Sequence, residues 1–310
     1  MSKQKIDSRV NFLGVEFPNP IVLSSGILGM TATSMEKVIT SGAGGVTTKS
    51  TNISGRDGNP CPKVITYEAG MLNCYGLTNA GFLNEKNEIK ELKQRRPENP
   101  VIISIFGFSL EEFEQIAKKL DQTQADLVEV NISCPNVKEE TPKPFACLTG
   151  MPRQVVKLVK KNTKKPIIVK LSPNVTDIVA IAKEVEDAGA DAISAINTLG
   201  PGMVINIEAK RPVLSVGSGG ISGPAIRPLA VRMIYDVYQA VKIPLVGIGG
   251  VTTGRDALEM IMAGAELVGV GSGVYYQGID IFAKINQEIR KWMQKNQVKS
   301  IAELVGAAHR

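Results

Sequence analysis

Short apolar segments alternate with amphipathic helical segments eight times along the chain, and this repetition restricts the fold more than any other feature. The apolar segments are rich in Val and Ile, which is typical of strands buried on both faces. We expect strands at residues 20–23, 45–48, 100–105, 126–130, 166–170, 191–196, 244–246 and 266–270. We expect helices at residues 34–40, 85–95, 109–120, 152–161, 175–189, 224–241 and 253–263, with the last helices filling 279–305.

A strand followed by a helix returns the chain to the same edge of a sheet, so repeated units of this kind predict parallel strands. Eight units without a linker or a break in composition predict an α/β fold, a single (β/α)8 TIM barrel that spans residues 1–310 as one domain. The alternative is a doubly wound open sheet. The GxGxxG fingerprint that follows the first strand of many such sheets is absent here.

Composition and charge exclude several classes of function. Lys and Arg number 36 against 30 Asp and Glu, but the lysines are scattered over helix faces and aromatic residues make up only 5%. We therefore expect no nucleic-acid binding. No segment approaches the roughly 20 apolar residues of a spanning helix. Residues 1–9 also lack the apolar centre of a signal peptide, so we expect a cytoplasmic protein that does not associate with a membrane.

The cysteines and the histidine limit the chemistry further. Cys61, Cys74, Cys134 and Cys147 form no CxxC pair, so we expect no metal or iron–sulfur site in this chain. His309, the only histidine, stands one residue from the C-terminus. We therefore expect any residue that carries out acid–base chemistry to be Cys, Lys, Asp, Glu or Tyr.

Two long insertions interrupt the repeats after predicted strands. Residues 52–82 and 199–223 are rich in Gly and Pro and show no helical period, and loops of that length are usually functional. A shorter segment, 139–145, carries two prolines and follows the fourth predicted strand, where we expect it to act as a lid. Because the carboxyl ends of barrel strands form the active face, we expect all three segments to lie there.

Polar residues stand at the ends of most of the predicted strands. Two glycine turns, 246–250 and 269–272, follow the last two strands, where barrels commonly bind a phosphate through backbone N–H groups. The alternative is that these glycines only make tight turns. Lys49 and Lys170 each end an apolar strand, which indicates either an anionic ligand or a carboxylate partner. Asparagines offer the donors and acceptors that a planar heterocycle requires, and they stand at Asn73, Asn131, Asn136 and Asn197.

Cys134 is the most unusual of these strand-end residues. It follows its strand in a polar loop closed by Pro135, whereas a packing cysteine belongs within the strand. A thiol with an ordinary pKa of roughly 8.5 is partly thiolate at neutral pH and serves as a nucleophile or as a general base. Because no histidine is available to activate it, we favour the role of general base acting on an oxidisable substrate.

The loop that contains this cysteine, Asn131-Ile132-Ser133-Cys134-Pro135-Asn136-Val137-Lys138, resembles the catalytic loop of class 1 dihydroorotate dehydrogenases, FMN enzymes of pyrimidine biosynthesis. The resemblance extends over nearly the whole chain. It includes Thr48-Lys49-Ser50, residues 73–79, 169–171, Asn197-Thr198, 219–224, 247–250 and Gly271-Ser272. The class 2 enzymes differ in having serine at the base and an N-terminal membrane helix.

Within class 1, residues 197–203 and 211–224 resemble the 1B subfamily. Those enzymes combine the barrel with a second subunit that carries FAD and an iron–sulfur cluster, and they pass electrons to NAD. The resemblance implies one FMN per chain, with FAD and the cluster only on the partner. It also implies a homodimer or a heterotetramer with that subunit.

The resemblance assigns roles to individual residues. Cys134 would take the proton from C5 of dihydroorotate while hydride leaves C6 for FMN. The substrate would contact Lys49, Asn73, Cys74, Tyr75, Gly76, Leu77, Asn131, Asn136, Asn197 and Thr198. FMN would contact Ser25, Lys49, Ser50, Ser104, Asn131, Lys170, Ile196, Gly223, Gly249, Gly250, Gly271 and Ser272, with Lys170 stabilising negative charge on the reduced ring.

Two positions depart from the family pattern. Ser104 stands where the family usually has asparagine near the flavin, and Tyr75 replaces a smaller aliphatic residue or methionine. Two alternatives to this function remain: a barrel like that of dihydropyrimidine dehydrogenase, which shares the Ser-Cys-Pro loop and FMN, and a catalytically silent flavin-binding subunit. Asn136 and Lys138 favour dihydroorotate as the substrate.

Overall fold

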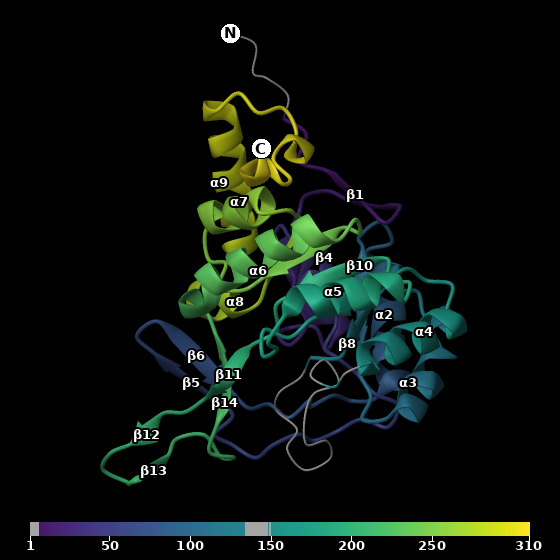
Figure 1. Ribbon diagram of the computed structural model, residues 1–310, viewed down its shortest axis with the longest axis vertical. Coiled ribbons are helices and arrows are strands. Elements are labelled where there is room, and N and C mark those ends of the chain that lie inside the picture. Colours follow the sequence, from purple (N-terminus) through teal and green to yellow (C-terminus); the bar gives the residue numbers. More distant parts are fainter. Residues whose placement is uncertain (1–5, 134–147, 149) are drawn as a thin grey trace.

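Eight parallel strands close into a barrel at the centre of the molecule. The computed structural model describes residues 6–133, 148 and 150–310. The strands neighbour one another in the order β10-β15-β16-β3-β4-β7-β8-β9 (Figure 1). Their bounds are β3 (Ile21–Leu23), β4 (Gly45–Thr47), β7 (Val101–Ile105), β8 (Leu127–Asn131), β9 (Ile167–Lys170), β10 (Ala192–Ala195), β15 (Leu245–Ile248) and β16 (Ala265–Val270). The predicted (β/α)8 barrel is confirmed.

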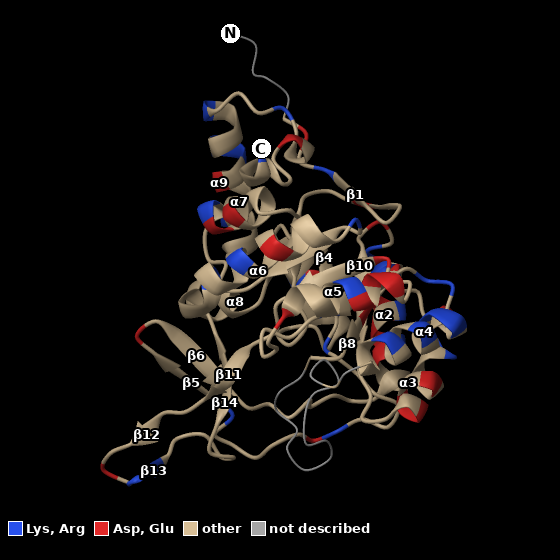
Figure 2. Ribbon diagram, in the orientation of Figure 1, with Lys and Arg blue, Asp and Glu red and all other residues tan. Residues whose placement is uncertain are grey.

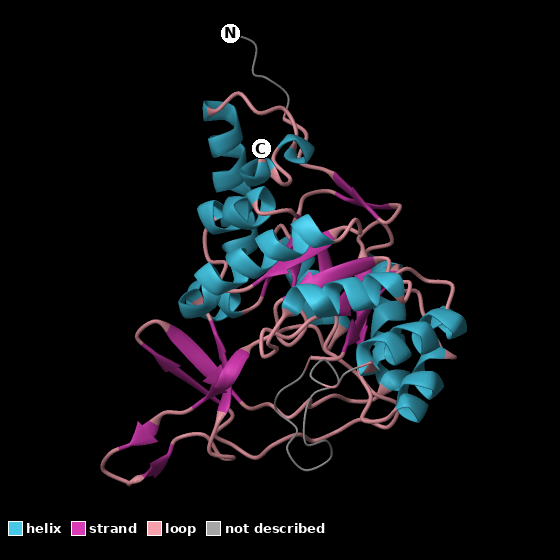
Figure 3. Ribbon diagram, viewed as in Figure 1, coloured by secondary structure: helices cyan, strands magenta, loops and turns pink. Residues whose placement is uncertain are grey.

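Helices cover the outside of the barrel, as the amphipathic periodicity predicted (Figure 3). They are α1 (Ala32–Thr40), α2 (Phe82–Arg95), α3 (Leu110–Ala117), α4 (Met151–Asn162), α5 (Ile178–Asp187), α6 (Arg227–Ala240), α7 (Gly254–Met262), α8 (Ser272–Gln277) and α9 (Ile281–Lys295). Helix α5 begins three residues later than predicted because the Asp177 side chain accepts a hydrogen bond from the Ala180 N–H and so caps the helix there. The short helix α8 had not been predicted.

A hairpin of β1 (Val10–Phe12) and β2 (Val15–Phe17) packs against the amino-terminal end of the barrel. Phe12 and Phe17 are fully buried and pack edge to face, with ring centroids 6.3 Å apart. They join one apolar layer with residues from seven barrel strands, among them Ile102 and Leu267. This end of the barrel is therefore filled by side chains, and the opposite end is left for a site.

The two long insertions form a sheet, although they were expected to be loops. Strands β5 (Val64–Tyr67) and β6 (Gly70–Asn73) of the first insertion pair with β11 (Leu199–Gly202) and β14 (Gly219–Ser222) of the second, in the order β11-β14-β6-β5. The second insertion also extends as the pair β12 (Ile205–Asn206) and β13 (Arg211–Pro212), which projects from the molecule at the lower left of Figure 1.

The glycine content of β14 explains why the sequence did not indicate this sheet, since glycine has low strand propensity. A Cβ atom on Gly219 would lie 2.4 Å from the Asn73 carbonyl oxygen, and one on Gly220 would lie 2.0 Å from Thr198 Oγ1. Gly219 therefore allows a close backbone approach between two segments about 150 residues apart, which pair with Gly220 opposite Asn73. Pairing at that separation leaves no local signal.

Charged side chains of both signs are interspersed over the outer helices, as expected for solvated helix faces (Figure 2). The inserted sheet carries few charges in comparison. Among residues 6–133, 148 and 150–310, no helix is long and apolar enough to cross a membrane.

Candidate functional site

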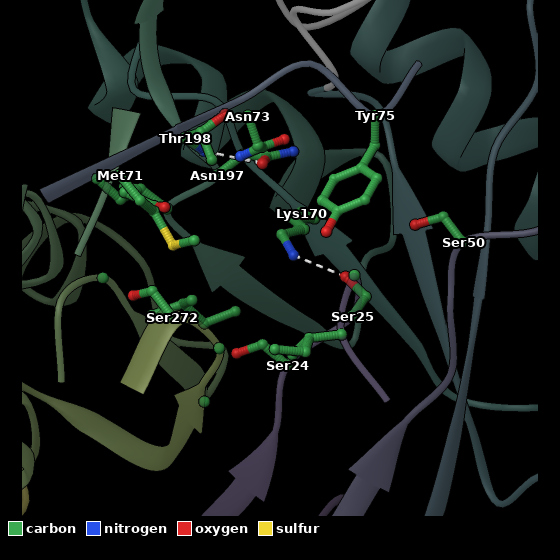
Figure 4. Close-up of a pocket in the computed structure, with 18 of the residues that line it drawn as sticks. Ser24, Ser25, Ser50, Met71, Asn73, Tyr75, Lys170, Asn197, Thr198 and Ser272 are labelled. Atoms are coloured by element: carbon green, nitrogen blue, oxygen red, sulfur yellow. Dashed lines mark hydrogen bonds between the residues drawn. The ribbon is translucent and has the colours of Figure 1, made fainter. Parts of the chain in front are cut away.

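A cavity of about 270 Å³ opens at the carboxyl ends of the barrel strands, beneath the inserted sheet. Its walls come from the carboxyl ends of β3, β4, β8, β9, β10, β15 and β16 or the residues directly after them, and from β6 and the residues after it (Figure 4). Sixteen residues predicted for the site line this one cavity: Ser25, Lys49, Ser50, Asn73, Tyr75, Gly76, Leu77, Asn131, Lys170, Ile196, Asn197, Thr198, Gly249, Gly250, Gly271 and Ser272.

Three other predicted site residues that the structure describes, Cys74, Ser104 and Gly223, do not line the cavity. Cys74 is buried in a separate apolar cluster with Leu72 and Leu214, and its thiol lies 3.8 Å from the Ser215 hydroxyl. Ser104 is fully buried below the cavity wall. Gly223 is not among the lining residues, although its neighbour Ser222 is. Cys134, Asn136 and the predicted lid, 139–145, lie outside the described residues.

Lys170 is the buried cation at the base of the cavity. Its Nζ atom donates a hydrogen bond of 2.8 Å to the Ser25 hydroxyl and lies 3.7 Å from Oε1 of Glu129 (Figure 4). Both partners of this ion pair are at most 5% exposed. A carboxylate partner was one of the two alternatives for this lysine. It comes from the middle of strand β8 rather than from a strand end.

The amides of Asn131 and Asn197 are held in fixed orientations. Asn131 Oδ1 accepts from both the backbone N–H and the hydroxyl of Ser133, and its Nδ2 donates to Ser50 Oγ at 3.0 Å. Asn197 Oδ1 accepts from the Thr198 N–H at 2.8 Å, and its Nδ2 donates to Ser133 Oγ at the same distance. Because a backbone N–H can only donate, these contacts determine which end of each amide is the oxygen.

Lys49 and Tyr75 form a second polar group on the cavity wall. The Lys49 ammonium lies 5.1 Å from the centroid of the Tyr75 ring, which is within the range of a cation–π interaction. Burial raises the pKa of the Tyr75 phenol, with a smaller contribution from Cys61, so the ring is neutral at physiological pH. Tyr75, which stands where a smaller residue was expected, therefore places the face of an aromatic ring against Lys49.

The site also includes polar residues that were not assigned roles from the sequence, among them Glu129, Ser194, Ser133 and Ser24. Glu129 and Ser194 lie beneath the cavity, Ser133 connects the two asparagines, and Ser24 lines the wall. Glu129 had a detectable signal, since an acidic residue stands at the centre of an otherwise apolar strand. Ser24 and Ser133 stand directly before Ser25 and Cys134, the two neighbouring residues for which roles were predicted.

The side chains of the cavity fit a flavin mononucleotide. Ser24 Oγ is buried and finds no hydrogen-bond partner among the described residues, so a ligand group in the cavity would satisfy it. The lining includes a lysine and amides, which suit the edge of a ring, and glycines and hydroxyls, which suit a phosphate.

The glycines at 249 and 250 also have an explanation within the protein. Gly250 has a φ of 69°, and a Cβ atom on it would lie 2.6 Å from the Gly223 carbonyl oxygen. A Cβ atom on Gly249 would lie 2.5 Å from that of Ala230. The tight-turn interpretation of this motif thus holds, and binding of a phosphate there stays a prediction.

Comparison with known proteins identifies the family. The family model described as dihydroorotate dehydrogenase matches residues 8–293. The catalytic subunit of dihydroorotate dehydrogenase B (NAD(+)) from Methanocaldococcus jannaschii is 40% identical over 307 residues, covering 97% of this chain and 98% of the relative. The subunits of the same name from Geobacter sp. (strain M21) and Brachyspira hyodysenteriae are each 42% identical, covering 98% and 97% of this chain and 99% and 98% of the relatives. The chain belongs to the dihydroorotate dehydrogenase family, and within it to the group of the B-type catalytic subunits.

Proposed function

We propose that this protein oxidises dihydroorotate to orotate in the biosynthesis of pyrimidines, with one FMN per chain. The observation that carries the proposal is that Lys49, Lys170, Asn73, Asn131 and Asn197 come together around one cavity. Two cations and three amides are complementary to an anionic pyrimidine ring beside an anionic cofactor. The names of the relatives support the same activity.

Bound FMN would accept the two electrons that leave the substrate, and the protein would supply binding, orientation and acid–base chemistry. Lys49 and the amides of Asn73, Asn131 and Asn197 would hold the substrate carboxylate and ring, because amides offer both donors and acceptors. Ser24, Ser25 and Lys170 would contact the cofactor. The fixed amide orientations of Asn131 and Asn197 mean that these contacts require no reorganisation when the substrate arrives.

Cys134 is proposed as the base that removes the proton from C5 of dihydroorotate. It follows Ser133, whose hydroxyl bridges Asn131 and Asn197, so its place in the chain is next to the proposed substrate amides. No histidine is available for the role, because His309 packs against Tyr235 with ring centroids 3.8 Å apart and lies outside the cavity.

The electrons are proposed to pass to NAD through a partner subunit that carries FAD and an iron–sulfur cluster. The printed names of the relatives describe catalytic subunits and NAD(+). Within residues 6–133, 148 and 150–310, no group of three or more His, Cys, Asp or Glu side chains is arranged to hold a metal ion. Purification of the untagged chain from its own cells shows whether a partner subunit copurifies. The composition of the purified complex then distinguishes a homodimer from a heterotetramer.

The purified protein is expected to be yellow, with about one FMN per chain, and anaerobic addition of dihydroorotate should bleach the flavin absorbance. Dihydrouracil is the matched control, because it lacks the carboxylate that Lys49 and the amides would bind. Bleaching by dihydrouracil in place of dihydroorotate would assign the protein to the dihydropyrimidine dehydrogenase type. A flavin that neither compound reduces would indicate a silent binding subunit, and colourless protein would contradict the proposal as a whole.

Replacement of Tyr75 by Leu is expected to weaken orotate binding roughly two- to five-fold, because it removes a cation–π contact worth about 0.5–1 kcal/mol that holds Lys49 in place. Tyr75→Phe keeps the ring and should bind orotate like the wild type. The dissociation constant follows from the change of the flavin spectrum on titration with orotate. Equal weakening in both variants would show that the phenol hydroxyl, rather than the ring face, makes the contact.

A further inference from the structure

A chain of hydrogen bonds runs beneath the cavity from Asn197 to Glu129. Asn197 donates to Ser133, Ser133 to Asn131, and Asn131 to Ser50. Ser50 and Ser104 are 2.8 Å apart, and Ser104 Oγ lies 2.9 Å from Glu129 Oε1. The carboxylate can only accept, so Ser104 uses its one proton on Glu129 and Ser50 must donate to Ser104. All donors in this chain therefore point towards Glu129.

Glu129 receives further contacts that fix its place. Ser194 Oγ donates to Oε2 at 3.1 Å, and the Lys170 ammonium lies 3.7 Å from Oε1. Glu129 is 3% exposed, and Ser104 and Ser194 are at most 1% exposed. A buried carboxylate is unfavourable unless a cation and hydrogen-bond donors compensate it, and here both are present.

The pair also determines the charge at the base of the cavity. Lys170 reaches the cavity, whereas Glu129 does not line it. For a ligand in the cavity, the positive charge of Lys170 is therefore partly offset by the negative charge of Glu129. Each charge acts strongly on the other, because little water is present to screen them.

We propose that Glu129 is a positioning residue that holds the Lys170 ammonium and, by offsetting its charge, sets the reduction potential of the bound flavin. The inference rests on the proposed FMN function. Negative charge gained by the cofactor on reduction is stabilised by Lys170 and destabilised by Glu129. The family resemblance implied a role in stabilising this charge for Lys170 only, and the structure places Glu129 beside it.

The test is the reduction potential of the FMN in the purified full-length protein, measured by anaerobic reductive titration against a reference dye. Glu129→Gln removes the negative charge and retains an acceptor oxygen. We expect the ratio of reduced to oxidised flavin at a given potential to rise at least tenfold, a shift of about +30 mV for a two-electron couple. Lys170→Met should shift the potential in the opposite direction, and the double variant should return towards the wild type, because it buries neither charge.

Glu266→Gln is the matched control, since Glu266 stands near the start of β16, at the end of the barrel away from the cavity. It should leave the potential unchanged. A change of less than threefold in Glu129→Gln, about 15 mV, or a shift to lower potential, would overturn the inference. A purely structural role for Glu129 would lower the melting temperature without moving the potential.

A second comparison covers the case in which Glu129→Gln does not fold. FMN should bind at least tenfold more tightly to the double variant Glu129→Gln/Lys170→Met than to Lys170→Met alone, because the single variant leaves a buried carboxylate without its cation. Equal or weaker binding to the double variant would overturn the inference. Failure of the proposed function is recognised separately in the wild-type protein, which would then carry either no FMN or an FMN that dihydroorotate does not reduce.

Discussion

Cys134→Ala is expected to slow reduction of the bound flavin by dihydroorotate about 100-fold or more while FMN remains bound. A positioned base typically contributes a factor of this size. Stopped-flow measurement of flavin bleaching under anaerobic conditions gives the rate of this step directly. The flavin content of the variant, measured from its absorbance, shows whether the cofactor site is intact.

Cys61→Ala is the appropriate control for this experiment. Cys61 is an exposed free thiol in the first insertion, and it is not among the residues that line the cavity. Its replacement should leave the rate of flavin reduction unchanged. Equal rates in Cys134→Ala and the wild type would show that Cys134 is not the base, and attention would then turn to the lysines of the cavity.

Glu85→Gln is expected to stabilise the protein at alkaline pH. Glu85 is 4% exposed, and its Oε1 has no hydrogen-bond partner among the described residues. Burial, with a smaller contribution from the charge of Glu88, raises the pKa of Glu85 from 4.5 to about 8. The unfolded chain ionises at the lower pKa, whereas the folded protein keeps the neutral acid.

The sign of the pH dependence follows from this difference. Below pH 4.5 Glu85 is protonated in both the folded and the unfolded state, so its titration does not change the free energy of unfolding. As the pH rises from there to about 8, the unfolded state releases a proton that the folded state retains, so stability falls with pH. The loss between pH 5 and pH 8 is about 3 kcal/mol in free energy of unfolding.

Urea denaturation of the wild type and of Glu85→Gln at pH 5 and pH 8 measures this effect. The gain from the substitution should be small at pH 5 and about 3 kcal/mol at pH 8. Glu98→Gln, at an exposed position, is the control and should give no gain that depends on pH. A gain that is the same at both pH values would mean that the buried carboxyl is not neutral in the folded protein.

The barrel and its active face could be predicted from the sequence because both depend on local patterns. Apolar segments such as Ile167–Lys170 carry the strand signal in their own residues, and the helices carry theirs in a repeat of about 3.6 residues. Eight such units predict a barrel, and the carboxyl ends of barrel strands form the active site. This rule predicts that the strand-end residues lie together, although they are up to 148 positions apart in the chain: Lys49, Asn131, Lys170 and Asn197. The structure brings all four to one cavity.

Tertiary structure alone decided the features that depend on pairing between distant segments. The inserted sheet forms because Gly219 allows the second insertion to approach Asn73 closely, and the pairing joins segments about 150 residues apart. Cys74 belongs to a motif whose other members line the cavity, yet packing turns its side chain into a separate cluster. In the sequence, Glu129 is only an acidic residue within an apolar strand. It is the counter-ion of Lys170 because β8 and β9 are neighbours in the barrel. A sequence specifies which groups are available, but the partners of buried charges depend on which strands become neighbours.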